Sequence, residues 1–352
     1  MSEEVAPRAY DADQTAFQQR LGALNLGALW VGRRGVDLSQ PRSPARPALW
    51  RYGDIRPSLE EAGRLIRAEE AFRRVLVMEN PAFPGEMRAT QTLYAGLQLV
   101  LPGEIAPCHR HSQTAFRFVL EGEGAFTSVD GERAWMRRGD FIVTPCWSWH
   151  DHANESEGPV VWLDVLDTPL VGFLDTVFRE SHDRPRQPID RPDGMSPARF
   201  GAGMLPVGYE ASRAASPVFS YPFARSRAAL AALARSTPPD ACHGLKMAYI
   251  DPATGGPATP TMGACLQLLP AGFDGAEYRA TDSAVYAAVE GRGRVRIGDE
   301  TIEWGPNDVF VVPGWRRHAL AADEDAVLFS VSERPVHEAL GLWREERFDR
   351  QG

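Results

Sequence analysis

The chain has 352 residues, of which 43% are hydrophobic and 24% charged, a composition typical of a globular protein with room for two cores. Its formal net charge of −9, without any basic run, argues against a nucleic-acid partner. No apolar stretch approaches the roughly 18–20 residues that cross a bilayer, the acidic first residues do not resemble a secretion signal, and the four cysteines form no CxxC pair, so a cytoplasmic protein is expected.

Residues 1–87 are predicted to form an N-terminal segment of helix and loop. Between residues 58 and 76, apolar side chains recur at intervals of three and four, which is the periodicity of an amphipathic helix. Ser58, which follows Pro57, has the side chain of a good N-cap. A helix is therefore expected to begin at Ser58.

From residue 88 the chain changes to short alternating runs separated by glycine and proline, which is typical of a β-sandwich or barrel. Five strands are predicted at regular spacing, over residues 97–101, 116–120, 125–129, 141–144 and 160–164. Residues 88–172 are therefore assigned to a first β domain. Residues 173–240 are rich in Pro, Arg and Ala and are assigned to a linker, with a helix over 227–235.

The strand pattern then resumes and repeats the first half. The residues around Gly122 align with those around Gly291, 169 positions later, and the residues before His150 align with those before His318, 168 positions later. Two matching segments at nearly equal offsets indicate an internal duplication. Residues 241–335 are therefore predicted to form a second, mainly β domain, and residues 336–352 a C-terminal tail.

Three histidines of the first domain are candidate metal ligands. His109 and His111 are separated by one residue, which in a strand places both side chains on one face, and His150 comes from a later strand. An HxH pattern alone is weak evidence, because such histidines are often core or surface residues. Here two glycines, a proline and Asn154 stand at fixed spacing around it, which favours a metal site with open coordination positions.

The second domain lacks this set of ligands. When the two halves are aligned, Tyr278 and Ala280 occupy the positions of His109 and His111, and only His318 remains. One imidazole does not hold a divalent metal, so the second domain is predicted to be structural.

These segments resemble the two cupin motifs, G-x5-H-x-H-x3,4-E-x6-G over residues 103–122 and G-x5-P-x-G-x2-H-x3-N over residues 139–154. Two positions depart from the motifs, with Ala115 in the glutamate position and Trp147 in that of the inner glycine. Residues 95–118, 140–152 and 162–171, with the words Trp-His-Asp-His and Trp-Leu-Asp-Val-Leu-Asp, resemble the gentisate 1,2-dioxygenases and their salicylate and 1-hydroxy-2-naphthoate relatives.

The resemblance implies a bicupin of two jelly-roll barrels, usually a homotetramer, with one non-haem Fe(II) per chain. Its implied partners are dioxygen and a small aromatic acid, with no nucleic acid or membrane. The implied reaction opens gentisate (2,5-dihydroxybenzoate) between the carboxyl-bearing and the adjacent hydroxyl-bearing carbon to give maleylpyruvate. The alternatives are salicylate, a 5-nitro, 5-halo or 5-amino salicylate, 1-hydroxy-2-naphthoate and, in a different class, a non-catalytic cupin that binds an aromatic acid.

Three further residues are predicted to act in catalysis. Arg117 lies six residues after His111, so alternation points it to the same interior, where a buried cation needs an anion. The resemblance makes Arg117 a clamp on the substrate carboxylate, with a structural salt bridge as the alternative. It also implies that His152, which shares a face with His150, bonds the reacting oxygens and assists proton transfer. Asp164 is implied to contact the far hydroxyl of the ring or to orient a neighbour; for both residues a structural role stays open.

The remaining predicted substrate-binding residues precede the metal ligands in the chain. The resemblance places Gln98 in the pocket, and it places Tyr94 and Gly96 on the wall that faces the ring, with core packing as an equal alternative. It also implies a second guanidinium on the substrate carboxylate, from Arg73 or Arg74. The sequence does not decide between these two arginines.

Overall fold

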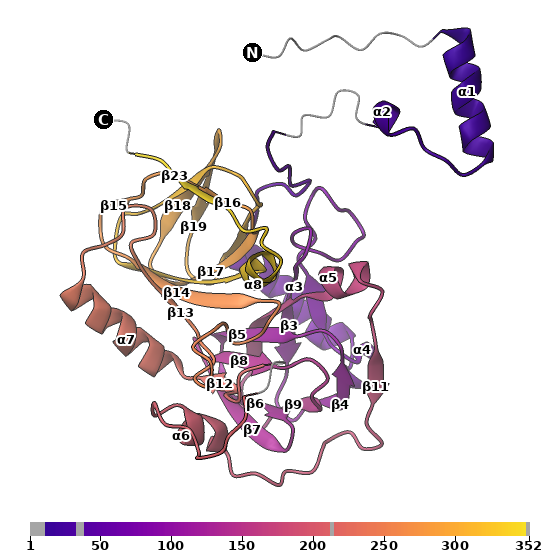
Figure 1. The fold of residues 1–352 in the computed structure, drawn as a ribbon. Helices are drawn as coiled ribbons and strands as arrows, with labels where there is room; N and C mark the ends of the chain where they lie inside the picture. Colours follow the sequence, from indigo (N-terminus) through magenta and orange to yellow (C-terminus); the bar gives the residue numbers. More distant parts are fainter. Residues whose placement is uncertain (1–10, 33–38, 212–214, 350–352) are drawn as a thin grey trace. The chain divides into compact units, whose positions relative to one another are not determined.

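The computed structural model describes residues 11–32, 39–211 and 215–349 (Figure 1). The chain divides into two compact units at residue 42. The first unit contains α1 (Ala12–Ala23), which begins with a capping box between Asp11 and Gln14, and α2 (Leu29–Gly32). All other elements belong to the second unit. No helix in the described ranges is long and apolar enough to span a bilayer.

The first jelly roll is built from two antiparallel sheets (Figure 1, purple to magenta). One sheet has the order β12 (Ser220–Tyr221), β8 (Phe141–Thr144), β5 (Ala115–Glu121), β10 (Val160–Leu166), β3 (Tyr94–Val100) and β2 (Val75–Val77). The other has the order β11 (Arg179–Ser181), β4 (Ile105–His111), β9 (His150–Asn154), β6 (Glu123–Val129) and β7 (Glu132–Arg137). All five predicted strands are present, as β3, β5, β6, β8 and β10.

The second jelly roll repeats this arrangement (Figure 1, orange to yellow). Its first sheet has the order β1 (Ala48–Trp50), β20 (Val309–Val312), β17 (Ala284–Glu290), β22 (Ala326–Ser332), β14 (Gly263–Leu269) and β13 (Leu245–Ala248). Its second sheet has the order β19 (Glu300–Trp304), β18 (Gly293–Ile297), β21 (His318–Ala322), β16 (Tyr278–Ala280) and β23 (Glu345–Arg347), with β15 (Phe273–Asp274) on β21. The order of the first sheet matches strand for strand, and that of the second sheet matches when it is read in the opposite direction, with β15 as the one additional strand among the described residues. This supports the duplication.

In the described part of the chain, six helices flank the two jelly rolls: α3 (Tyr52–Leu65), α4 (Ala68–Ala71), α5 (Thr168–Phe173), α6 (Met195–Phe200), α7 (Phe223–Ser236) and α8 (Arg334–Ala339). The predicted start of the first long helix at Ser58 is wrong. α3 begins at Tyr52, contains Pro57 and ends well before residue 76. The first turn of α3 is capped by a residue far away in the sequence, because the Tyr52 N–H donates to the Asp308 carboxylate, 256 residues away, at 2.8 Å. No local signal could indicate that cap.

The two halves exchange their first strands. β1 precedes the first jelly roll but pairs with β20 of the second, and β12 precedes the second jelly roll but pairs with β8 of the first. The helices that follow are equivalent as well: the Phe223 N–H of α7 donates to Asp140 at 2.8 Å, as that of Tyr52 does to Asp308. The repeat therefore includes an edge strand and a helix before each jelly roll.

One hydrophobic core joins the two jelly rolls. Phe118 of β5 stacks on Phe329 of β22, with ring centroids 4.2 Å apart, and both side chains are about 1% exposed. The core continues from Leu97 in the first jelly roll to Leu266 in the second. Continuous burial of this kind makes the two halves one rigid scaffold for the side chains in their interiors.

Candidate active site

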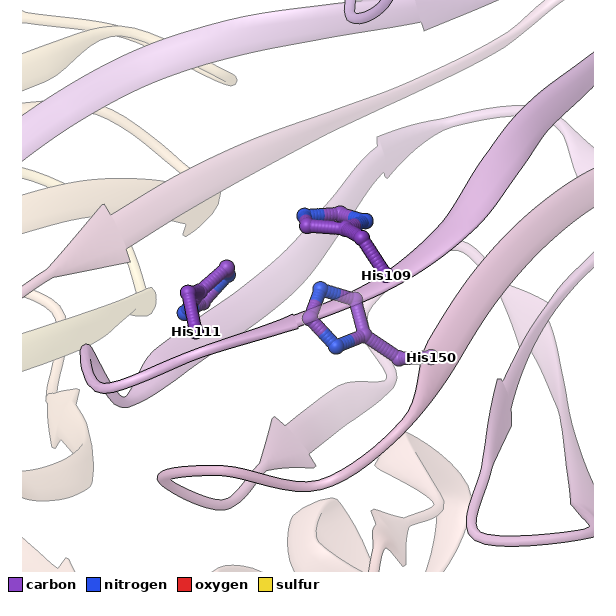
Figure 2. Close-up of side chains that lie close together, drawn as sticks. All are labelled: His109, His111 and His150. Carbon is purple, nitrogen blue, oxygen red and sulfur yellow. The ribbon is translucent and has the colours of Figure 1, made fainter. Parts of the chain in front are cut away.

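The three predicted ligands converge inside the first jelly roll. His109 and His111 extend from β4 and His150 from β9, and Figure 2 shows their rings turned toward one another. His109 and His150 face each other in register across the two strands. One ligand nitrogen from each of the three side chains lies within 4.8 Å of the others. Local strand alternation and one strand pairing are therefore enough to assemble the set.

Hydrogen bonds from the protein orient these rings for a metal. His111 Nδ1 lies 2.8 Å from the Gln113 carbonyl oxygen, and His150 Nδ1 lies 2.9 Å from that of Ser148. A carbonyl only accepts, so Nδ1 carries the proton and Nε2 presents its lone pair. His150 Nε2 is buried and has no hydrogen-bond partner, as expected of a metal-facing atom.

The three imidazoles are neutral at physiological pH. Burial, with the charge of Arg73, lowers the pKa of His109 to about 2, and burial lowers the pKa of His111 to about 4. Burial also holds the pKa of His150 well below its ordinary value. Neutral imidazole is the form that binds a metal, and this donor set suits Zn, Cu, Fe or Ni.

Two guanidinium groups and one carboxylate lie beside the histidines. Arg117 and Asp164 are partners in register on β5 and β10, and Arg117 Nε lies 3.2 Å from Asp164 Oδ1. Arg73 Nη2 donates to the Pro107 carbonyl at 2.9 Å and lies 2.8 Å from His109 Nδ1. Burial and the charge of Arg117 lower the pKa of Arg73 to about 9, which still leaves it protonated. The site therefore has one positive charge more than Asp164 neutralises, and that excess favours an anionic ligand.

His152 lies two residues after His150 on β9. It is fully buried, its ring centroid is 5.9 Å from that of His150, and its Nδ1 lies 2.8 Å from Thr127 Oγ1. Its Nε2 is buried without a hydrogen-bond partner. Burial, and then the charges of Arg117 and Arg73, hold its pKa well below the ordinary value, so the ring is neutral.

A cavity of about 490 Å³ opens on this site. Eight of the predicted residues line it: Arg73, Tyr94, Gln98, His109, His111, Arg117, His150 and Asp164. Burial raises the pKa of Asp164 to about 6 against the opposing charge of Arg117. The volume is within the range of small-molecule sites, so an aromatic acid of one or two rings fits.

Three predicted residues do not line the cavity. His152 is fully buried, and Arg74 forms an ion pair with Glu104. Arg73 is therefore the arginine of that pair that faces the site. Gly96 does not line the cavity itself but packs against two residues that do: a Cβ on it would be 2.6 Å from Val75 Cγ1 and 2.9 Å from the Tyr94 hydroxyl.

Sequence reasoning missed seven cavity residues, namely Val75, Glu86, Met87, Arg88, Leu166, Thr168 and Pro169. Alternation from Arg73 along β2 could have indicated Val75. Residues 86–88 come from a loop between β2 and β3, where no periodicity applies. Their position depends on the path of the chain in space.

The second jelly roll has no equivalent ligand set. Tyr278 of β16 and His318 of β21 are paired in register, as His109 and His150 are in the first half. Among the described residues, only the first jelly roll brings three potential metal ligands together.

Comparison with known proteins places the chain in a family. Residues 96–166 match the model of the cupin domain. The gentisate 1,2-dioxygenase 1 of Aquipseudomonas alcaligenes is 49% identical over 339 residues, which cover 96% of this chain and 98% of the relative. The chain belongs to the gentisate 1,2-dioxygenase family. The 5-aminosalicylate 1,2-dioxygenase of a Comamonas species is 37% identical, covering 99% of this chain and 94% of the relative.

The fold of this gentisate 1,2-dioxygenase family member is similar to a solved structure along its whole length. The crystal structure of salicylate 1,2-dioxygenase from Pseudoaminobacter salicylatoxidans as an adduct with gentisate superposes with a TM-score of 0.91 at 31% identity. The match covers 99% of this chain and 98% of the other. The predicted bicupin fold and the prediction of a ring-cleaving dioxygenase are thus confirmed.

Proposed function

We propose that this dioxygenase opens gentisate between its carboxyl-bearing and adjacent hydroxyl-bearing carbons, giving maleylpyruvate, with one Fe(II) per chain and dioxygen as co-substrate. The observation that carries the proposal is the combination of three neutral imidazoles with an excess positive charge in one cavity. A three-imidazole site keeps the full charge of a divalent ion. An acid that chelates through its carboxylate and an ionised ortho-hydroxyl neutralises that charge.

His109, His111 and His150 fit a ferrous ion, since one ring nitrogen of each lies within 4.8 Å of the others, and the Nδ1 protons of His111 and His150 face backbone carbonyls. Bound there, iron would supply open positions for the chelating oxygens of the acid and for dioxygen. The set contains no fourth protein ligand, which distinguishes it from a closed structural zinc site.

The surrounding side chains would bind and orient the acid. Arg117 and Arg73, which both line the cavity, supply fixed positive charge for its carboxylate. His152 does not line the cavity, but its ring centroid is 5.9 Å from that of His150 and its buried Nε2 has no hydrogen-bond partner, so an acid that reaches past His150 would meet it as a partner for proton transfer. Gln98 and Asp164 would hydrogen-bond the rest of the ring, and Tyr94 would form its wall.

A second candidate substrate is salicylate or a 5-substituted salicylate. The relative that is named for 5-aminosalicylate is 37% identical, and a salicylate dioxygenase of the same fold has been crystallised with gentisate. Gentisate is favoured because the 49% identical relative is named for it. The same arginines and histidines would serve either acid.

Oxygen uptake tests the proposal. Protein loaded anaerobically with Fe(II) should consume about one dioxygen per gentisate when air is admitted, with a product that absorbs as an open-chain acid. Oxygen uptake with salicylates but not with gentisate would mean that the substrate is the second candidate. Absence of uptake with every 2-hydroxybenzoate would refute it and favour a non-catalytic binding protein.

A homo-oligomer, with four copies in the family, stays our proposal for the assembly. An apolar segment on the surface of the second unit supports it: Phe173 is 84% exposed, Leu174 59%, Val177 55% and Phe178 64%. Exposed apolar patches of this kind commonly mark protein interfaces. Light scattering that finds a monomer would contradict it. A cytoplasmic location also stays a prediction, which the four free cysteines fit.

A further inference from the structure

Lysine occurs once in the 352 residues, at position 246, while the other residues counted among the 38 lysines and arginines are all arginines. Lys246 lies on β13 and lines a second cavity, of about 110 Å³, inside the second jelly roll. This cavity has no part in the proposed ring cleavage.

The second cavity is the repeat-related counterpart of the first. Gln98 of β3 pairs with Val75 of β2, and the corresponding Gln267 of β14 pairs with Lys246 of β13. Val75 and Lys246 line their respective cavities, so they hold the same place in the two halves. The duplication has thus kept an interior cavity while its histidines were replaced.

The charged pair of the first cavity has also been replaced. Arg117 and Asp164 are register partners in the first half, and Tyr286 and Ser330 are register partners at the same place in the second. Both line the second cavity without carrying charge. The second cavity has a cation at a different place, on Lys246 of β13, which is the edge strand opposite β1 in the same sheet. The second interior therefore has its positive group where the first has a valine.

Lys246 forms no ion pair with any residue that the structure describes. Burial lowers its pKa, but the acidic groups of Tyr286, Cys265 and Asp282 outweigh that effect and raise it above the usual value. Lys246 is therefore protonated at neutral pH. Asp282 is the one carboxylate among the described lining residues, and it accepts a hydrogen bond from Trp343 Nε1 at 3.3 Å.

The other lining groups add positive or neutral surface. Arg316 and Arg334 line the cavity as well, and Arg334 is paired with Glu338 at 2.7 Å. Burial lowers the pKa of His243 to about 3 and that of His318 to about 4, so both rings are neutral. Cations thus outnumber carboxylates in the lining, which favours an anion.

A hydrogen-bond acceptor is available opposite the charge. His318 Nδ1 lies 3.1 Å from the Arg316 carbonyl oxygen, so Nδ1 carries the proton and Nε2 is left as an acceptor. The Tyr278 hydroxyl already donates to Glu345 at 2.9 Å, so this ring contributes a wall rather than a free donor. The interior can therefore satisfy a ligand that has both an anionic group and a hydroxyl.

We propose that the second cavity is a binding site for a small aliphatic hydroxycarboxylate, with its carboxylate on Lys246 and its hydroxyl toward His318. Size sets the class of ligand: a cavity of about 150 Å³ holds one benzene molecule, and this one measures about 110 Å³. An acid of two to four carbon atoms fits, whereas an aromatic acid of the kind taken by the first cavity does not.

The single lysine provides a direct reporter. Reductive methylation with ¹³C-formaldehyde gives one lysine dimethylamine NMR signal beside that of the N-terminal amine, and it keeps the positive charge. Lactate added to the full-length protein, with or without iron, should shift this signal saturably, and benzoate at equal concentration should not. A signal that lactate leaves unmoved, or that benzoate moves equally, would overturn the proposal.

Calorimetry on unmodified protein supplies the second measurement. Lys246→Met should weaken lactate binding by about ten- to a hundredfold, the effect of one charge-assisted hydrogen bond, whereas Lys246→Arg should retain much of it. Arg117→Met is the matched control in the first cavity and should not change this binding event. Retained ring-cleavage activity shows that the Lys246 variants are folded. Wild-type lactate affinity in folded Lys246→Met would refute the site.

Discussion

Replacing Arg117 with methionine tests whether the positive excess of the first cavity binds the carboxylate of the substrate. The guanidinium is buried and its Nε lies 3.2 Å from Asp164 Oδ1, so the change removes a desolvated charge but keeps much of the side chain's volume. Truncating one partner of a buried charge pair costs about 2–5 kcal/mol. Because about 1.4 kcal/mol corresponds to a factor of ten, the affinity for salicylate should fall about 30- to 5,000-fold.

The assay compares two chelating ligands. Salicylate offers a carboxylate and a hydroxyl, whereas catechol offers two hydroxyls and no carboxylate. Both are titrated anaerobically into Fe(II)-loaded wild type, Arg117→Met and, as a control, Arg292→Met, which changes an arginine paired with Glu324 on the surface. Arg117→Met should weaken the binding of salicylate far more than the binding of catechol, while the iron content stays unchanged. Equal losses for the two ligands would mean that Arg117 acts through Asp164 or the shape of the site, and would refute the reasoning.

Three further outcomes are expected. His111→Ala should lose its iron in a ferrozine assay, whereas Tyr278→Ala should keep about one ion per chain, and iron loss from the latter would contradict a metal-free second half. Gly96→Ala should cost about 1–3 kcal/mol of stability and lower kcat/KM, because the added Cβ would lie 2.6 Å from Val75 Cγ1. The double variant with Val75→Ala should recover part of the stability and of kcat/KM. If it recovers neither, that contact is not the cause. Burial raises the pKa of Glu333 from 4.5 to about 8, so its ionisation makes the folded state lose stability as pH rises between these values. Glu333→Gln should therefore gain up to roughly 5 kcal/mol over wild type across that range in urea unfolding, and a pH-independent difference would rule this out.

The metal ligands could be predicted because their geometry is local. His109 and His111 share a face by strand alternation, and His150 follows at a fixed motif spacing, so no knowledge of distant contacts was needed. Arg117 followed from the same alternation, whereas Asp164, its register partner, was proposed from the family resemblance. Where side-chain direction depends on the strand alone, sequence reasoning reached the site.

The rest depended on contacts between distant segments. Arg73 and Arg74 are adjacent in sequence, but only Arg74 forms an ion pair with Glu104, which lies 30 residues further along the chain. Similarly, the start of α3 is set by Asp308 from the other half of the chain. Patterns in a single sequence do not show such pairings. The structure was therefore needed to decide which arginine faces the site and to place the start of α3 at Tyr52.

The exchange of β1 and β12 has a consequence for how such a chain can arise and be divided. Each half contributes the outermost strand of the sheet that belongs to the other half. A single copy of the repeat could fill that position only by taking the strand of a second copy, which is the geometry of a domain-swapped homodimer. The two-part chain is therefore a covalently joined pair of swapped protomers, and fragments cut between residues 182 and 219 should fold together rather than apart.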